Sequence, residues 1–138
     1  METRIFTPDE ANALLPELNE DLRRLQTLTR QFEERCRELR SQKASWAVQM
    51  VDGTAGNADP FFEEESRLDF LRIEADLLIS NFARKGVLLK MIEPGLIDFP
   101  AVVNGEDVLI CWRQGESSVK HYHGWHDGYQ SRKPLPDV

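Results

Sequence analysis

The sequence lacks any apolar run long enough to span a membrane. Its opening stretch, Met1 to Phe6, is too short and mixed for a secretory signal. Basic residues are outnumbered, with 17 Lys and Arg against 24 Asp and Glu and a formal net charge of −7. Because that charge repels a polyanion, we expect a soluble cytoplasmic protein with neither a nucleic-acid nor a membrane partner.

Cysteine is scarce and the common catalytic motifs are missing. Cys36 falls on a helical stripe and Cys111 in an apolar run, which predicts two reduced core thiols. The sequence has no Cys-x-x-Cys pair, no phosphate-binding loop and no His-Glu-x-x-His helix. These absences favour a protein that is not an enzyme, and an enzymatic role stays open. No cofactor is expected, the alternative being a divalent metal such as zinc or iron.

Two long helices are predicted from the spacing of apolar residues. From Thr7 to Leu39 they recur at alternating steps of four and three, as in a helical seam. The segment Thr7-Pro8-Asp9-Glu10 has the residues of a capping box at its start. We predict one helix from about Thr7 to Val48 and a second from about Pro60 to Lys85, paired as a long, coiled-coil-like antiparallel hairpin.

After Gly86 the pattern changes to short β-like runs separated by turn signals, among them Asn104-Gly105. The predicted strands are Val87 to Ile92, Leu96 to Val103, Val108 to Arg113 and Ser118 to His123. The fold class is therefore α+β, a helical hairpin followed by a three- or four-stranded antiparallel meander. We predict one domain over residues 1–138, with the hairpin at about 7–85 and the meander and His/Trp-rich tail at about 87–138.

The two predicted helices differ in length, about 60 Å against about 40 Å at 1.5 Å per residue. The longer helix would then carry apolar side chains that its partner leaves uncovered: Leu28, Phe32, Leu39 and Trp46. Pairing of two hairpins would cover them. We therefore predict a homodimer through the long helices, and the favoured function is that of an interaction or assembly protein.

All three histidines lie within six residues near the C-terminus. His121 and His123 are two apart on a predicted strand, so both imidazoles point to one face, as in zinc and non-haem iron sites. With His126 they form the predicted metal set, in which Asp127 or Cys111 could replace His126 as the third ligand. The structural alternative, in which these rings only pack and hydrogen-bond to close a small core, is favoured.

A second candidate site is a small polar pocket at the sheet end. Its predicted residues are Asp98, Arg113, His123, Asp127 and Arg132. The two arginines would recognise an anion, whereas the plainer alternative is a structural cluster of salt bridges. A metal- or small-ligand-binding protein, possibly enzymatic, is thus the alternative to an assembly role.

Several motifs together resemble a known family. They include the run Gly95 to Ala101, with the sequence Gly-Leu-Ile-Asp-Phe-Pro-Ala, the following Cys111-Trp112-Arg113, and the terminal Gly128-Tyr129. The chain resembles, over nearly its whole length, a bacterial family of unknown function, domain-of-unknown-function family 2203. The resemblance implies no activity. Family members usually carry an acidic residue shortly before the terminal Gly-aromatic pair, and here His126 or Asp127 takes that place.

Overall fold

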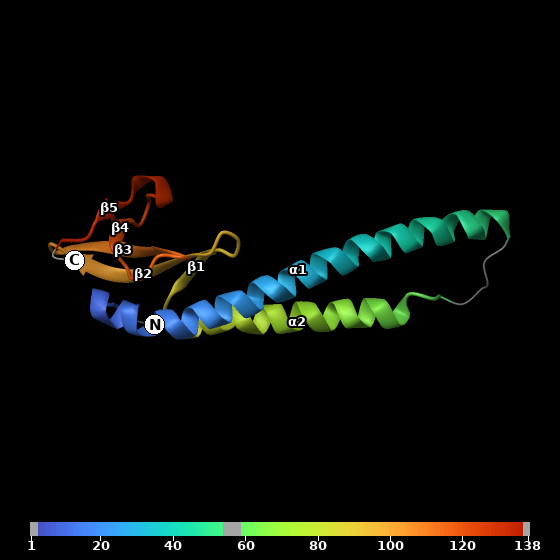
Figure 1. Cartoon of the computed structure of the whole chain (residues 1–138), viewed down its shortest axis with the longest axis horizontal. Coiled ribbons are helices and arrows are strands. Elements are labelled where there is room, and N and C mark those ends of the chain that lie inside the picture. The colour runs from blue at the N-terminus through green and yellow to red at the C-terminus, as the bar shows by residue number, and fades with distance from the viewer. Residues whose placement is uncertain (1–2, 54–58, 137–138) are drawn as a thin grey trace. The chain divides into compact units, whose positions relative to one another are not determined.

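The computed structural model describes residues 3–53 and 59–136 of the chain. Two helices come first and the strands follow (Figure 1). The elements are α1 (Pro8–Asp52), α2 (Phe62–Arg84), β1 (Leu88–Met91), β2 (Leu96–Val103), β3 (Glu106–Arg113), β4 (His121–Gly124), the 3-10 helix η1 (Tyr129–Ser131) and β5 (Lys133–Pro134). The predicted α+β fold is confirmed, with each helix end within a few residues of its prediction.

The contacts group into two compact units. The sheet unit comprises Met1–Leu25 and Leu78–Val138, and the hairpin unit comprises Gln26–Leu77. Both helices contribute residues to both units. The prediction of a single domain stays a prediction.

The helices begin and end where their sequence signals place them. The Thr7 backbone N–H donates to Glu10 Oε1 at 2.9 Å, and the Glu10 N–H donates to Thr7 Oγ1 at 3.1 Å, which confirms the capping box. At the end of α2, Gly86 has φ +84° and the Val87 N–H donates to the Phe82 carbonyl at 3.2 Å. This is a Schellman termination, for which glycine suits the left-handed position.

The strands form one antiparallel sheet in the order β1-β2-β3-β4-β5. Asn104 and Gly105 join β2 to β3 with φ of 53° and 80°, which matches a type I′ hairpin turn. The sheet has one strand more than predicted because β5 pairs with β4. The Leu135 N–H then donates to the Lys120 carbonyl at 2.8 Å and fixes the C-terminal segment.

Within the sheet unit, the first turns of α1 lie on one side of the sheet and the C-terminal segment lies on the other (Figure 1). On the α1 side, the rings of Phe6 and Phe99 meet edge to face with centroids 5.3 Å apart. A Cβ at Gly95 would clash with Leu22, so glycine lets the chain before β2 approach the helix closely. Other side chains without solvent exposure complete this core: Leu18, Leu22, Leu25, Ile97, Ile110 and Val119.

The hairpin unit has a smaller core of its own. Leu39, Phe61 and Leu68 are buried, and the half-buried Phe32, Cys36 and Trp46 pack against them. The expectation that Phe32, Leu39 and Trp46 lie uncovered in a single chain is therefore wrong, because α2 and Phe61 pack on this part of α1. The homodimer itself stays a prediction.

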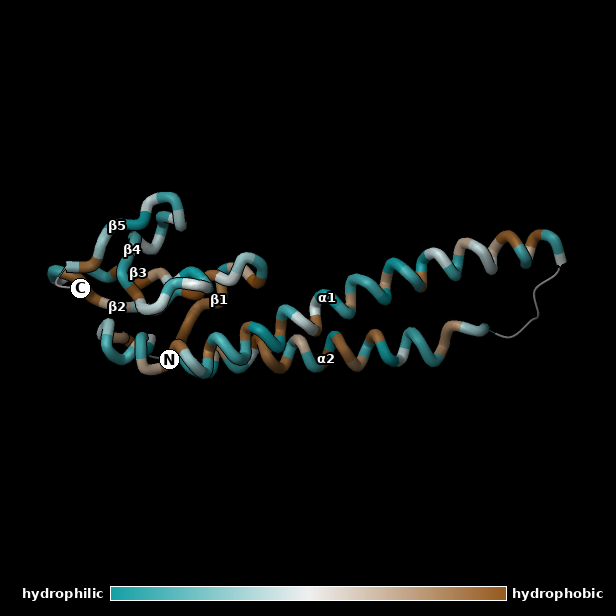
Figure 2. Tube along the Cα trace, in the orientation of Figure 1, coloured by the Kyte–Doolittle hydropathy of each residue, from teal (hydrophilic) through white to brown (hydrophobic). Residues whose placement is uncertain are grey.

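Hydrophilic residues recur along both helices between the hydrophobic ones (Figure 2). This alternation suits helices that bury one stripe each and expose the rest. None of the described helices is long and apolar enough to cross a membrane.

Candidate functional site

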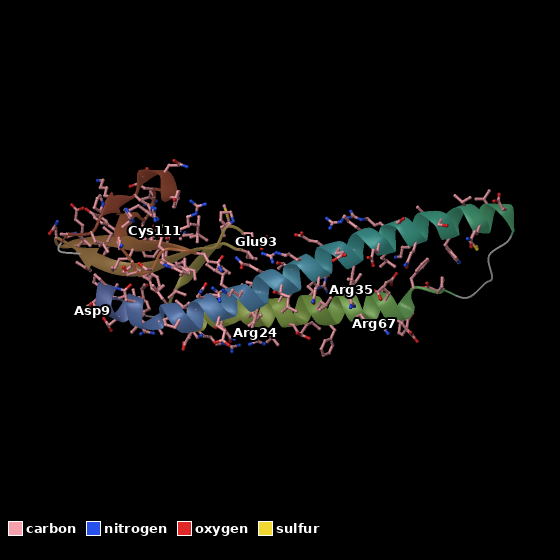
Figure 3. All side chains as sticks on the ribbon, viewed as in Figure 1. Asp9, Arg24, Arg35, Arg67, Glu93 and Cys111 are labelled. Atoms are coloured by element: carbon pink, nitrogen blue, oxygen red, sulfur yellow. The ribbon has the colours of Figure 1, made fainter. Side chains whose placement is uncertain are left out.

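Strand register gathers the candidate residues on the sheet face opposite Phe99. Asp98 on β2 is paired with Cys111 on β3, and Cys111 is paired with His121 on β4. Paired residues on neighbouring strands point to the same face, and His123 shares that face with His121 because it lies two positions along. Cys111 lies within the sheet unit (Figure 3).

Three of these side chains converge. Asp98, Cys111 and His123 each offer a ligand atom, and the three atoms lie within 4.8 Å of one another. All three residues are almost fully buried, with exposed fractions of 2%, 1% and 3%. Across residues 3–53 and 59–136, this is the only group of three such side chains with metal-binding spacing. We call it the Asp-Cys-His cluster.

The orientation of His123 is fixed by its neighbours. Its Nδ1 lies 2.8 Å from the Gly124 carbonyl, which only accepts, so Nδ1 carries a hydrogen. Nε2 faces Asp98 Oδ2 at 3.1 Å, within hydrogen-bond distance. The second oxygen, Asp98 Oδ1, is buried and accepts no hydrogen bond from the described residues. The cluster thus holds an acceptor without a partner, which is costly inside a protein.

Burial shapes the acidity of the cluster. It raises the pKa of the Asp98 carboxyl, and the opposing effects of His123, Cys111 and Lys90 do not cancel it. Burial and, next, the Asp98 carboxylate raise the pKa of the Cys111 thiol to about 12. A thiol of that pKa is protonated at neutral pH, which argues against a role as a free nucleophile.

The C-terminal segment is held beside the cluster by an arginine and a glutamate. Arg132 Nη1 donates to both carboxylate oxygens of Glu116 at 3.1 Å. Its Nη2 donates to the Tyr129 hydroxyl at 3.3 Å, and its guanidinium lies 4.2 Å from the centre of the Tyr129 ring. Arg113 Nη1 donates to the same hydroxyl at 3.3 Å. Charge-assisted bonds of this kind are stronger than neutral ones, so Tyr129 has a fixed place.

A pocket of about 210 Å³ opens on the cluster. Its lining consists of Lys90, Leu96, Asp98, Cys111, His123, Asp127, Gly128 and Tyr129. Of the residues predicted for a polar pocket, Asp98, His123 and Asp127 line it. Arg113 and Arg132 are not part of the lining, but both donate to the Tyr129 hydroxyl, and Arg132 also interacts with the Cys111 thiol.

The predicted metal set of His121, His123 and His126 is placed differently. His121 is half-buried, with Nδ1 3.8 Å from Glu116 Oε2, and His126 is exposed. Neither belongs to the Asp-Cys-His cluster, whereas Cys111, the alternative third ligand, does. Sequence reasoning did not single out Lys90. The sequence gives no clear signal for it, because the register of β1 against β2 shifts between Leu89 and Met91, where Lys90 lies.

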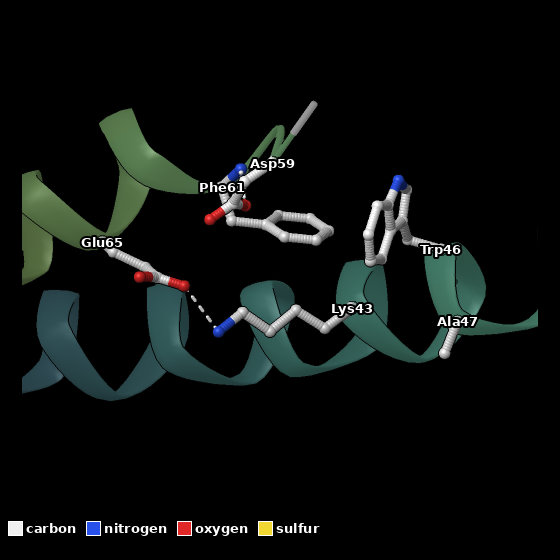
Figure 4. A pocket seen from close by; sticks show the side chains of 6 residues that line it. All are labelled: Lys43, Trp46, Ala47, Asp59, Phe61 and Glu65. Carbon is white, nitrogen blue, oxygen red and sulfur yellow. Dashed lines mark hydrogen bonds and ion pairs between the residues drawn. The ribbon is translucent and has the colours of Figure 1, made fainter. Parts of the chain in front are cut away.

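A larger pocket, of about 490 Å³, lies in the hairpin unit. Figure 4 shows the rings of Phe61 and Trp46 beside the Lys43–Glu65 ion pair. The full lining is Lys43, Trp46, Ala47, Asp59, Phe61 and Glu65. Lys43 and Glu65 are nearly half exposed and 2.6 Å apart. Because this ion pair is exposed to solvent and each charge already has a partner, the larger pocket offers no buried ionisable group of the kind that the smaller pocket has.

The fold and the cluster define an α+β protein with a carboxylate, a thiol and an imidazole buried together beside a pocket. The chain belongs to a family described as an uncharacterized conserved protein, DUF2203, whose model matches residues 4–135. Comparison with curated proteins and with solved structures gave no match.

Proposed function

We propose that this protein binds a divalent metal ion, zinc foremost, through Asp98, Cys111 and His123. The observation that carries the proposal is the convergence of three chemically different ligand atoms, all buried, within 4.8 Å. Thiolate, imidazole and carboxylate are together the ligands that zinc accepts in proteins.

The geometry needs little adjustment to hold an ion. Bonds of about 2.0 to 2.3 Å in a tetrahedral site place donor atoms about 3.3 to 3.6 Å apart. His123 Nε2 and Asp98 Oδ2 are 3.1 Å apart. The bond from Nδ1 to the Gly124 carbonyl leaves Nε2 as the ligand atom, and metal-binding histidines usually have such an outer acceptor.

Charge balance supports the same proposal. Burying a carboxylate and a thiolate without a cation is unfavourable, and a doubly charged ion neutralises both. An ion at this position would also give Asp98 Oδ1 the partner that the described residues do not supply. Three protein ligands leave a coordination position open, on the side where the pocket lies.

Metal analysis of the purified protein, followed by reloading of the chelated protein with Zn²⁺ or Co²⁺, tests the proposal. We expect one ion per chain and, with Co²⁺, a thiolate-to-cobalt charge-transfer band. Asp98→Asn, Cys111→Ser and His123→Gln should each weaken binding by more than the roughly 10- to 100-fold that outer-shell changes cost. His121→Gln and His126→Gln are matched controls that leave the cluster intact.

The control histidines also separate this site from the set predicted from sequence. If His121→Gln and His126→Gln abolished binding while Cys111→Ser and Asp98→Asn did not, the His121, His123 and His126 set would replace the Asp-Cys-His cluster. If the wild-type protein bound no zinc, cobalt, iron or manganese after reloading, the buried pair of Asp98 and His123 would be structural only.

Self-association through the hairpin is the second candidate function. It is supported by Phe70, Ile73 and Leu77 on α2, which lie 54–65% exposed on the face opposite the buried Leu68 and Leu78. Light scattering should then give twice the chain mass for the wild type, and the double variant Phe70→Ser and Ile73→Ser should be monomeric. A wild-type monomer at high micromolar concentration would exclude this role.

A further inference from the structure

We infer that the open coordination position binds a small organic monocarboxylate, with one oxygen on the metal and its charge facing Lys90. This inference deepens the proposed metal centre and depends on it. It names the chemical class of the ligand that the pocket would take.

The first argument is the arrangement of the pocket. The Asp-Cys-His cluster forms one part of the lining, and Lys90 is the single cationic residue in the remainder. Lys90 lies close enough to Asp98 to favour ionisation of that carboxyl electrostatically. A molecule bound to the ion from the pocket side would therefore lie between the metal and the Lys90 ammonium.

The second argument is the change in charge when the ion binds. Without the ion, the Asp98 carboxylate is a counter-charge for Lys90. A divalent ion would take up the charges of Asp98 and Cys111, and Lys90 would then stand beside a neutral centre. An anion in the open position restores the balance, and a charge-assisted contact to an ammonium is among the stronger polar interactions in a protein.

The third argument concerns the body of the ligand. The Tyr129 hydroxyl is bonded to Arg113 and Arg132 and the Arg132 guanidinium lies over one face of the ring, so the rest of the ring is the part of Tyr129 that lines the pocket. Leu96 adds a second apolar surface. Apolar lining with a few polar anchors is typical of sites for organic molecules. A volume of about 210 Å³ suits a short-chain acid rather than a larger metabolite.

The fourth argument is the acidic rim. The Asp127 N–H donates to the Gly124 carbonyl at 3.0 Å, and a Cβ at Gly124 would lie 2.8 Å from Asp127 Oδ2. The turn after β4 thus places the Asp127 carboxylate close to the Gly124 backbone and in the pocket lining. A dianion such as phosphate would meet this second negative charge, whereas a monocarboxylate needs only Lys90 and the ion.

The test uses the full chain loaded with Co²⁺, whose visible spectrum reports a change of ligand. Acetate, butyrate, azide and phosphate are titrated separately. We expect acetate and butyrate to shift the spectrum at saturation, butyrate to bind more tightly than acetate, and phosphate to bind at least tenfold more weakly. Lys90→Gln should weaken butyrate binding roughly tenfold without loss of the thiolate-to-cobalt band. Lys120→Gln, an exposed lysine outside the lining, is the matched control.

The outcomes separate this inference from the metal proposal. A protein that holds Co²⁺ with its thiolate band, but whose spectrum no carboxylate changes, overturns the inference and leaves the metal centre standing. Phosphate or azide binding as tightly as butyrate overturns the assignment to organic carboxylates. Equal butyrate affinity in Lys90→Gln overturns the role of Lys90. A wild type that binds no Co²⁺ removes the metal centre and the inference with it.

Discussion

The sheet unit and the hairpin unit differ in how far they bury pairs of ionisable side chains. The sheet unit buries Asp98 and His123 together, with exposed fractions of 2% and 3%. The hairpin unit keeps its ion pair of Lys43 and Glu65 nearly half exposed. Electrostatic effects are strong only where water is excluded, so we place the proposed metal-binding site in the sheet unit, although the larger pocket lies in the hairpin unit.

The two units also contain matched residues that allow the comparison to be measured. Each has a buried phenylalanine, Phe99 or Phe61, that meets another aromatic ring edge to face. Each also has one free cysteine, Cys36 or Cys111. Each has a lysine, Lys43 or Lys85, that forms an ion pair with a carboxylate. Substituting one member of each pair at a time tests whether the sheet unit is the more tightly packed part.

The largest difference is expected for the phenylalanines. Phe99 has no exposed surface and belongs to the extensive core of the sheet unit, so Phe99→Ala should lower the free energy of unfolding by about 3–5 kcal/mol. Phe61→Ala should cost less, towards the lower end of that range, because Phe61 is 8% exposed in a small cluster. Guanidinium unfolding followed by circular dichroism measures both. Equal losses would contradict the comparison.

Much of the fold could be predicted because its signals are local. The capping box at Thr7, the left-handed Gly86 and the Asn104-Gly105 turn each depend on a few adjacent residues. Strand β5 was not predicted because Lys133–Pro134 is two residues long and contains proline, which is unfavourable in most strand positions. It forms because tertiary contacts place it beside β4.

The candidate site was only partly accessible from sequence. Asp98, His123 and Asp127 were assigned to one polar pocket, and Cys111 was expected mainly as a core thiol. The meeting of Asp98 with Cys111 follows from the register of β2 against β3. The predicted two-residue Asn104-Gly105 turn sets that register, so this contact could have been predicted from the sequence. Cys111 and not His126 is the third member of the cluster with Asp98 and His123. This depends on the turn that follows β4, which leaves His126 exposed.

The second prediction compares the two thiols in metal-free protein. Cys111 is 1% exposed and its pKa is raised to about 12, whereas Cys36 is half-buried. Because alkylation needs an accessible thiolate, iodoacetamide at pH 8 should modify Cys36 at least tenfold faster. Peptide mass spectrometry over time gives both rates. Unfolding in guanidinium should bring the two rates together, and faster modification of Cys111 in the native protein would contradict its burial.

The third prediction concerns Lys85 in the sheet unit, which donates to Asp21 Oδ2 at 2.8 Å and lies 3.1 Å from Glu17 Oε1. Burial, the largest influence, lowers the pKa of Lys85, but the two carboxylates outweigh it and the net shift is upward from 10.5. Stability from a raised lysine pKa is fully present at neutral pH and is lost as the pH rises through that pKa. Lys85→Met should therefore cost about 1 kcal/mol at pH 7 and progressively less above pH 10.5.

Urea unfolding of the wild type and of Lys85→Met at pH 7 and at the highest pH where both fold measures this difference. Other groups that titrate in this range affect both proteins alike, so the difference between them isolates Lys85. A cost that stayed constant with pH would assign the effect to lost packing of the lysine stem rather than to its charge.

The smallest effect is expected for the corresponding lysine of the hairpin unit. Lys43 pairs with Glu65 at 2.6 Å, shorter than the bonds of Lys85, and its ammonium lies 5.7 Å from the centre of the Phe61 ring. Distance alone would make it the stronger pair. However, both side chains are nearly half exposed, and exposed pairs contribute little because water and salt screen them. We expect Lys43→Met to cost at most about 0.5 kcal/mol in urea unfolding, and the cost to vanish in about 1 M salt. A loss larger than that of Lys85→Met would show that distance rather than burial ranks the ion pairs of this protein, and the contrast between its two units would fail.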